Sequence, residues 1–228
     1  MTRTLYVFRP EPGLGVTIQT AEASGLPVTG CPLFKVKPVE WSAPPRTDFD
    51  ALLVGSSNVF RHGGSGLAKL AGLPVYAVGE ATAEGAREKG FLVAKTGKGG
   101  LQNLLDSLAG RELRFLRLAG EAMVELSPPT GIGIETRIVY KTVALGISPS
   151  VSKSMREDGG IALLHSGEAA RRLTEECERL GIDRKTIAIA SLGPRIAEIA
   201  GEGWQDVHTA DQPRDDALLA LAKALCQG

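Results

Sequence analysis

Short runs of hydrophobic residues alternate with amphipathic stretches along most of the chain. Strands are predicted for the apolar runs Thr4–Phe8, Asp50–Val54, Pro74–Val78, Leu113–Leu118, Ile161–Leu164, Thr186–Ala190 and Trp204–His208, and an extended segment for Leu26–Phe34. Helices are predicted for Leu14–Ala23, Glu80–Lys89, Leu101–Leu108, Gly167–Leu180, Pro194–Ala200 and Pro213–Cys226. Because strands that alternate with helices form parallel sheets covered on both faces, the pattern predicts an α/β fold.

Two segments interrupt this rhythm. Val36–Pro45 is rich in proline, which excludes a helix interior, and Arg137–Leu145 is β-branched with no helix attached. We interpret them as two extended linkers, paired with each other, that cross between two domains. The alternative is one long loop and one edge strand of a single sheet.

The two crossings divide the chain into two predicted domains. Residues 1–34 and 146–228 form a discontinuous first domain, residues 46–134 an inserted second domain, and residues 35–45 and 135–145 the linker strands, with a cleft between the domains. An internal similarity supports this division. Ala51–Val54 is matched by Ala162–His165, and the helix start after Gly79 is matched by the one after Gly193. We therefore expect two domains of similar architecture.

Charge and cysteine content narrow the class of protein. The 26 basic and 26 acidic residues of the 228 balance, whereas a nucleic-acid-binding protein usually carries a basic excess. No apolar stretch is long enough for a membrane span, and the first residues lack the pattern of a signal peptide. Three scattered cysteines fit a reduced compartment. We expect a cytoplasmic monomer with a small-molecule substrate and neither a nucleic-acid nor a membrane partner.

Familiar catalytic motifs are missing from the sequence. There is no P-loop, no dinucleotide fingerprint after the first strand and no metalloprotease motif, and His62, His165 and His208 lie far apart without metal-ligand spacing. The glycine-rich stretch Gly97–Gly100 follows no convincing strand, so we interpret it as a plain turn rather than a phosphate loop. We expect neither a metal nor a cofactor.

Helix starts that directly follow strands are the recurring feature. In a parallel sheet these turns share the carboxyl edge, and each offers unpaired backbone N–H groups and the positive end of a helix dipole. A row of them suits a ligand with many carboxylates or phosphates. The alternative is ordinary helix capping. The turns are Arg9–Pro10, Ser56–Ser57, Gly79–Glu80, Gly120–Glu121, Ser166–Gly167 and Gly193–Pro194–Arg195.

Two side chains add candidate chemistry. Arg9 follows the first strand, where it could bind an anion or form a structural salt bridge. Tyr140 lies on the second crossing, where a phenol could donate a proton to a leaving group, although a half-buried strand aromatic is the simpler interpretation.

The order of several segments resembles the uroporphyrinogen-III synthase family. They run from TLYVFRP through DFDALLVGSSNVF, VYAVGEATAEGAREKGF, LRFLRLAGE, IVYKT and IALLHSGEAARRL to IAIASLGPRIAEIA and cover nearly the whole chain. The resemblance implies two α/β domains joined by a two-stranded linker and a lyase without cofactor or metal. The implied reaction closes hydroxymethylbilane, a linear tetrapyrrole with eight carboxylates, to uroporphyrinogen III with loss of water and inversion of the last ring.

The resemblance also assigns residues by position. The family's linker tyrosine falls on Tyr140, which would assist departure of the substrate hydroxyl, and the Gly-x-x-Thr-Ala turn falls on Gly79, Thr82 and Ala83. Its Arg-Pro falls on Arg9–Pro10, and its small polar turn on Ser56–Ser57. The strand-end pattern adds Ser166, Gly167, Gly193, Pro194 and Arg195 as candidate substrate-binding residues.

The sequence departs from the family at three places. Arg195–Ile196 replaces the threonines often found after Gly-Pro, Gly13 stands where a glutamine is common, and the arginine often found after the Gly120 turn is absent. The missing threonines, together with the row of backbone N–H groups, support a second hypothesis, a non-catalytic hinged binding protein for a polycarboxylate. A hydride-transferring Rossmann enzyme is a third hypothesis. The absence of a glycine-rich fingerprint counts against the Rossmann enzyme.

Overall fold

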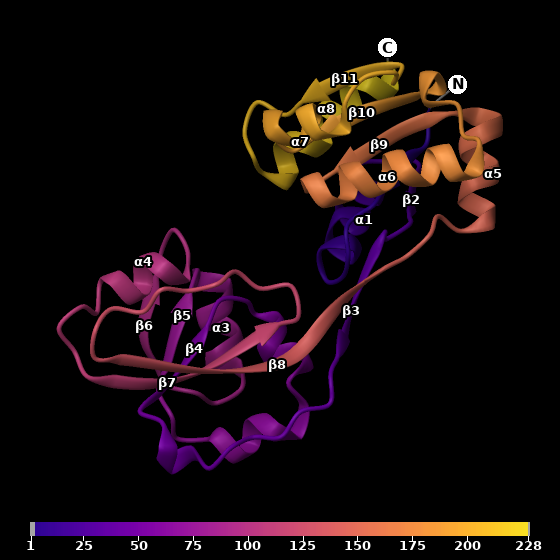
Figure 1. The fold of residues 1–228 in the computed structure, drawn as a ribbon. Helices are drawn as coiled ribbons and strands as arrows, with labels where there is room; N and C mark the ends of the chain where they lie inside the picture. The colour runs from indigo at the N-terminus through magenta and orange to yellow at the C-terminus, as the bar shows by residue number, and fades with distance from the viewer. Residues whose placement is uncertain (1–2, 228) are drawn as a thin grey trace. The chain divides into compact units, whose positions relative to one another are not determined.

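The computed structural model describes residues 3–227 and divides them into two compact units. Unit 1 comprises the described residues through Lys35 and those from Ala144 onward, and unit 2 comprises Val36–Val143. Each unit is a sheet flanked by helices (Figure 1), which confirms the predicted α/β class. No helix within residues 3–227 is both long and apolar enough to cross a membrane.

The sheet of unit 1 contains five strands, and every adjacent pair is parallel. In spatial order they are β11 (Asp206–Thr209), β10 (Ile187–Ser191), β9 (Gly160–Leu164), β1 (Leu5–Val7) and β2 (Val28–Gly30). Helices α1 (Gly13–Ala23) and α8 (Asp215–Gln227) pack on one face, and α5 (Pro149–Asp158), α6 (Gly167–Leu180) and α7 (Pro194–Ala200) pack on the other.

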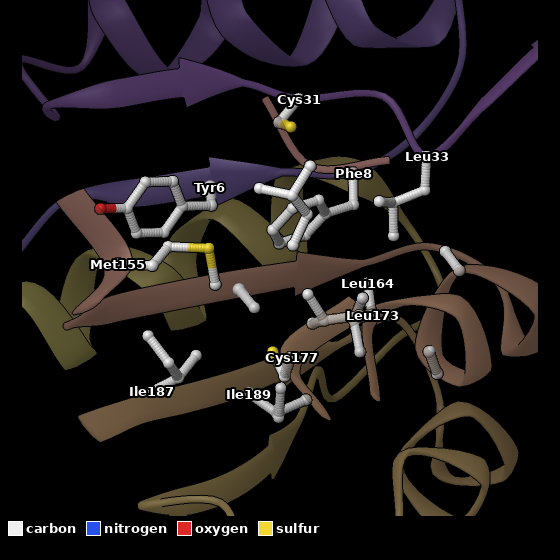
Figure 2. Close-up of a cluster of buried hydrophobic side chains, with 14 of the residues drawn as sticks. Tyr6, Phe8, Cys31, Leu33, Met155, Leu164, Leu173, Cys177, Ile187 and Ile189 are labelled. Carbon is white, nitrogen blue, oxygen red and sulfur yellow. The ribbon is translucent and has the colours of Figure 1, made fainter. Parts of the chain in front are cut away.

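The two faces of this sheet explain why its central strands are continuously apolar. Alternate residues of β1 point to opposite faces, so Tyr6 joins the cluster under α5–α7 while Leu5 and Val7 join the one under α1 and α8. Figure 2 shows Tyr6 and Phe8 beside Met155, with Leu164, Leu173 and Ile189 also in the first cluster. Both faces are therefore buried, as parallel sheets require.

Local signals fix the ends of α6. Ser166 caps its first turn, since its hydroxyl accepts a hydrogen bond from the Ala169 N–H at 3.2 Å. Gly181 ends the helix in the left-handed conformation, with φ 63°, where glycine carries no steric penalty. The predicted range Gly167–Leu180 is confirmed.

The sheet of unit 2 contains six strands. In spatial order they are β3 (Phe34–Pro38), β8 (Ile132–Ala144), β7 (Leu113–Gly120), β4 (Ala51–Val54), β5 (Val75–Val78) and β6 (Val93–Gly97). Helices α2 (Asn58–His62) and α3 (Glu80–Glu88) and the 3-10 helix η2 (Gly64–Leu70) share one face, and α4 (Leu101–Asp106) lies on the other. The short 3-10 helices η1 (Arg46–Asp48) and η3 (Arg184–Thr186) complete the elements.

The strands β3 and β8 connect the two units. Leu145 N–H donates to Leu33 O at 2.7 Å and Val39 N–H to Val139 O at 3.1 Å, so the partner numbers run in opposite directions and the pair is antiparallel. β8 also pairs in parallel with β7 as far as Tyr140. Because of this second ladder, the structural division falls at residues 143/144 rather than at the expected domain end at 134.

The two sheets share one strand order. The order β11-β10-β9-β1-β2 corresponds to β6-β5-β4-β7-β8, and helices α6 and α7 take the places of α2 and α3. The matched runs at 51–54 and 162–165 thus fall on corresponding strands, β4 in one sheet and β9 in the other, with His165 directly after the end of β9.

Two expectations at the carboxyl edge of unit 2 are wrong. Gly97 ends a real strand, β6, which was missed because VAKTG mixes polar and small residues. No helix follows Gly120, since residues 121–131 connect β7 to β8 without one. The helix start expected after Ser56–Ser57 is present as the short helix α2, whereas α5, which is mostly polar, was not predicted.

Candidate functional site

In unit 2 the strands β5 and β6 are added on one side of β4, and the chain then crosses over to add β7 on the other side of β4. The helices that connect β4, β5 and β6 pack on one face of the sheet, and α4, which leads to β7, packs on the other. A crevice therefore opens at this reversal point, where the carboxyl ends of β4 and β7 meet. Open α/β sheets bind ligands at such a point.

A small cavity of about 90 Å³ occupies this place. It is lined by Gly55 and Ser56 after β4, by Gly120 at the end of β7, and by Tyr140 from β8, with Leu118, Ala119, Ala122 and Met123. The structure therefore brings together two sequence-predicted residues, Ser56 and Tyr140, that are 84 positions apart.

The Tyr140 ring is held against the backbone of Gly120. Tyr140 pairs with Gly120 across the sheet, and Glu121 N–H donates to Tyr140 O at 3.0 Å. A Cβ at position 120 would lie 2.5 Å from Tyr140 Cε2 and 2.9 Å from its hydroxyl, so only glycine fits there. The half-buried ring packs on the core, while its hydroxyl forms no hydrogen bond to another group in residues 3–227.

His62 is the nearest aromatic neighbour of Tyr140. Their ring centroids are 6.5 Å apart at an interplanar angle of 45°. Burial, with a smaller contribution from the Arg61 charge, lowers the pKa of His62 below its usual value. This shift favours the neutral imidazole beside the phenol.

The polar turn after β4 is largely engaged in local contacts. Ser56 Oγ accepts from Asn58 N–H at 3.3 Å, and Ser57 Oγ accepts from the Arg61 guanidinium at 2.8 Å. Of these two predicted residues, Ser56 lines the cavity and Ser57 mainly orients Arg61.

The start of α3 differs from the sequence expectation in detail. Thr82 and Ala83 are buried, and their N–H groups donate to Gly79 O at 3.1 and 3.2 Å. The preceding residues Glu80 and Ala81 are exposed, and among residues 3–227 their N–H groups have no backbone acceptor. The available donors at this turn thus belong to Glu80, which is part of the expected Gly79–Glu80 turn, and to Ala81, which the sequence did not single out.

Unit 1 gathers polar side chains where the carboxyl ends of β1 and β9 meet, at its own reversal point. Arg9 Nη1 donates to Asp215 Oδ2 at 2.5 Å and to Thr17 Oγ1 at 3.1 Å, and Thr17 also donates to Asp215 at 3.1 Å. Arg9 thus forms the structural salt bridge that the sequence left open, and Pro10 beside it is partly buried.

His165 joins this cluster from the end of β9. Its side chain is only 7% exposed, and Nε2 lies 3.3 Å from Asp215 Oδ1 without hydrogen-bond alignment. Burial, and then the Arg9 charge, lower the pKa of His165 to about 4, although Asp215 acts in the opposite direction. His165 is therefore neutral at pH 7.

The remaining predicted residues of unit 1 lie at the starts of α6 and α7. Gly167 packs so closely on Ile199 that a Cβ there would overlap it, while Gly193 has open space around it. Pro194 and Arg195 are exposed, and within residues 3–227 the Arg195 side chain has no hydrogen-bond or ion-pair partner. These turns present N–H groups at the same sheet edge as Arg9.

The sequence did not reveal Thr17, Asp215 or the role of His165. They come from three distant segments, and only the fold brings them to Arg9. Residues 3–227 contain no cluster of three or more His, Cys, Asp or Glu that could hold a metal ion.

Comparison with known proteins adds the family. Residues 16–220 match the family model described as uroporphyrinogen-III synthase HemD. The chain belongs to the uroporphyrinogen-III synthase family. No curated protein matches the sequence significantly.

Solved structures agree with this fold. The uroporphyrinogen-III synthetase of Helicobacter pylori is 18% identical with a TM-score of 0.67, covering 99% of this chain and 100% of its own. A mutant uroporphyrinogen III synthase of Thermus thermophilus is 14% identical with a TM-score of 0.52, at the same coverage. At these identities the likeness establishes a shared two-domain α/β fold.

Family membership fixes the activity. The chain is a lyase of tetrapyrrole biosynthesis that closes hydroxymethylbilane to uroporphyrinogen III with loss of water. Its substrate is a small-molecule tetrapyrrole. The predicted family and function are confirmed.

Proposed function

We propose that Tyr140 is the catalytic acid of this reaction and that the strand-end turns of both units bind substrate carboxylates. The observation that carries the proposal is the cavity where Tyr140 faces Ser56 beside Gly120. Its hydroxyl, without an internal acceptor, is available to the substrate hydroxyl that departs as water.

The carboxylates meet neutral donors and two arginine side chains, Arg9 and Arg195, in this proposal. Exposed N–H groups at helix starts suit carboxylates because they add to the positive end of the helix dipole. The proposed substrate-binding residues are Arg9, Pro10, Ser56, Ser57, Gly79, Thr82, Ala83, Ser166, Gly167, Gly193, Pro194 and Arg195. Glu80 and Ala81 join them because their N–H groups are free.

The acid role is tested by Tyr140→Phe in an isomer-resolved assay. Loss of a positioned acid typically costs about 10²-fold or more in rate, so uroporphyrinogen III should fall by that factor. Unassisted closure should then leave uroporphyrinogen I as the main product, which chromatography separates. Tyr76→Phe is the matched control, because Tyr76 packs edge-on against Phe115 in the other core of unit 2.

Two outcomes would contradict the proposal. Unchanged turnover in Tyr140→Phe would remove the phenol from the mechanism. Tight uroporphyrinogen binding by the wild-type chain without formation of isomer III would instead favour a non-catalytic binding protein.

The same proposal extends to assembly and compartment. We expect a cytoplasmic monomer, in line with three buried free cysteines and balanced charge. Light scattering across a concentration series should give the mass of one chain.

A further inference from the structure

Arg117 is a buried arginine in the middle of β7. Only 5% of the residue is exposed. Its neighbours Leu116 and Leu118 point to the core under α2 and α3, so Arg117 shares the opposite face with Phe115, below the connection 121–131.

No carboxylate of the described residues compensates this charge. Within residues 3–227 Arg117 forms no ion pair, and its Nη2 donates only to the carbonyl of Val124 at 2.9 Å. The Nε atom is buried without an acceptor. Burial lowers the pKa of Arg117, yet an arginine stays protonated at neutral pH. A buried, unpaired cation with an open donor is unfavourable unless an anion joins it.

Arg117 borders a cavity large enough for such an anion. The cavity has a volume of about 330 Å³, and its walls are Met123, Val124 and Leu126 of the connection with Ile134 and Thr136 of β8. Glu125 also borders it but does not pair with Arg117. Met123 lines the Tyr140 cavity as well, so the two cavities adjoin.

We infer that Arg117 and this cavity form a carboxylate-binding site that takes an acid side chain of the tetrapyrrole. The inference rests on the proposed function for the identity of the ligand. A guanidinium offers several N–H donors in one plane, which match the two oxygens of a carboxylate. Met123 and Val124, 43% and 69% exposed, supply apolar surface for the attached methylene groups or pyrrole ring.

Calorimetric titration with uroporphyrinogen III under anaerobic conditions tests the site. Arg117→Met keeps an unbranched apolar stem that packs under the connection and removes the charged guanidinium, and it should raise the dissociation constant about tenfold or more. Arg114→Met is the matched control, since Arg114 lies on the same strand with a side chain that is 60% exposed. The control should bind like the wild type. Equal affinity in Arg117→Met overturns the inference.

A second variant tests the site without changing a buried residue. Val124→Glu places a carboxylate at the exposed mouth of the cavity, where it should pair with Arg117 and weaken binding by a similar factor. Leu92→Glu adds the same charge at an equally exposed apolar position of unit 2 and should leave affinity unchanged. Wild-type affinity in Val124→Glu overturns the inference, as does an equal loss in Leu92→Glu.

A free small carboxylate is the other ligand with the chemistry that the Arg117 site would recognise. Malonate at constant ionic strength should raise the melting temperature of the wild type less than uroporphyrinogen III does. If only malonate protects, and Arg117→Met abolishes that protection without changing uroporphyrinogen affinity, the site does not serve the tetrapyrrole. All these measurements follow binding rather than turnover. They therefore test the Arg117 site even when the turnover assay contradicts the Tyr140 proposal.

Discussion

Tyr140 and Gly120 depend on each other because the phenol ring occupies the space where any other residue would carry Cβ. Their backbones pair across β7 and β8, and a shift in the ladder occurs between Ala119 and Gly120. The position of the phenol is thus set by a neighbour that has no side chain of its own.

Substitution of Gly120 by alanine tests this dependence. The new Cβ would lie 2.5 Å from the ring, so the ring must move. We expect a loss of about 1–3 kcal/mol in the free energy of unfolding, as for other overpacked sites. Uroporphyrinogen III formation should fall toward the level of Tyr140→Phe. Urea unfolding and the isomer assay measure the two effects.

The double variant Gly120→Ala with Tyr140→Ala is the control. Removing the ring removes the overlap, so the alanine at 120 should cost less in that background than in the wild type. An equal cost in both backgrounds would show that the ring is not what excludes a side chain from position 120.

Single residues differ in how far the sequence could foretell them. Tyr140 was noted for its place on the second crossing, but only the family resemblance favoured an acid role over that of a packing residue, since one tyrosine on a β-branched strand is more often a packing residue. Arg117 was missed because a charge inside an apolar run suggests an outward position. Its alternation with Leu116 and Leu118 placed it on the side of Phe115, and only the structure shows that this side is covered.

At the level of elements, the ends of β1 and β9 are tied to the start of α8 by one carboxylate. Asp215 in the first turn of α8 contacts Arg9, Thr17 and His165. The cluster favours the neutral form of His165, because a protonated imidazole would be a second buried cation close to Arg9.

This cluster predicts an acid-sensitive stability. The pKa of His165 is about 4 in the folded protein and near 6.5 when unfolded, so the unfolded chain binds the extra proton between these values. The free energy of unfolding should therefore fall as pH drops from about 6.5 to 4, by up to about 3 kcal/mol from this group.

Urea unfolding of the wild type and His165→Asn across this pH range measures the effect. The wild type should lose more stability than the variant between the two ends of the range. Parallel pH profiles would show that His165 is not responsible.

Most elements were predictable because their apolar positions repeat with a clear period. Strands β4, β9 and β10 are short apolar runs, and the amphipathic α6 begins at a serine cap and ends at a glycine. Strand β6 and helix α5 were missed because their segments are largely polar, and tertiary pairing rather than local pattern decides their structure. The contacts of Asp215 were equally hidden, since they span about 200 positions.

At the level of the molecule, the hydrophobic clusters divide by unit. The clusters under α5–α7 and under α1 and α8 contain only residues of unit 1, and the other two contain only residues of unit 2. The three cysteines, Cys31, Cys177 and Cys226, all lie buried in unit 1. Thiol reactivity therefore reports on one unit.

Thiol labelling in urea should separate the unfolding of the two units. Burial raises the pKa of Cys177 to about 12 and also raises the pKa values of Cys31 and Cys226, so labelling by N-ethylmaleimide at pH 7 should be slow until unit 1 unfolds. Leu163→Ala in unit 1 should lower the urea midpoint for labelling, since such a substitution costs about 2–5 kcal/mol.

Leu53→Ala is the matched variant in unit 2, where Leu53 is equally buried at the corresponding strand. It should leave the labelling midpoint unchanged while lowering the stability of its own unit. Equal shifts in both variants would mean that the chain unfolds in a single cooperative step.

The two sheets have the same spatial order of strands, but their strands are distributed differently along the chain. Strands β4 to β8 follow one another without interruption, whereas the central pair of unit 1 joins β1 to β9 across more than 150 residues. During synthesis on the ribosome, the inserted unit emerges whole while β1, which can pair with β2, still awaits β9 on its other side. At about 5–20 residues per second, that interval lasts on the order of ten seconds. For that time the edge of β1 that will pair with β9 is open, and it is the edge that a chaperone would have to shield.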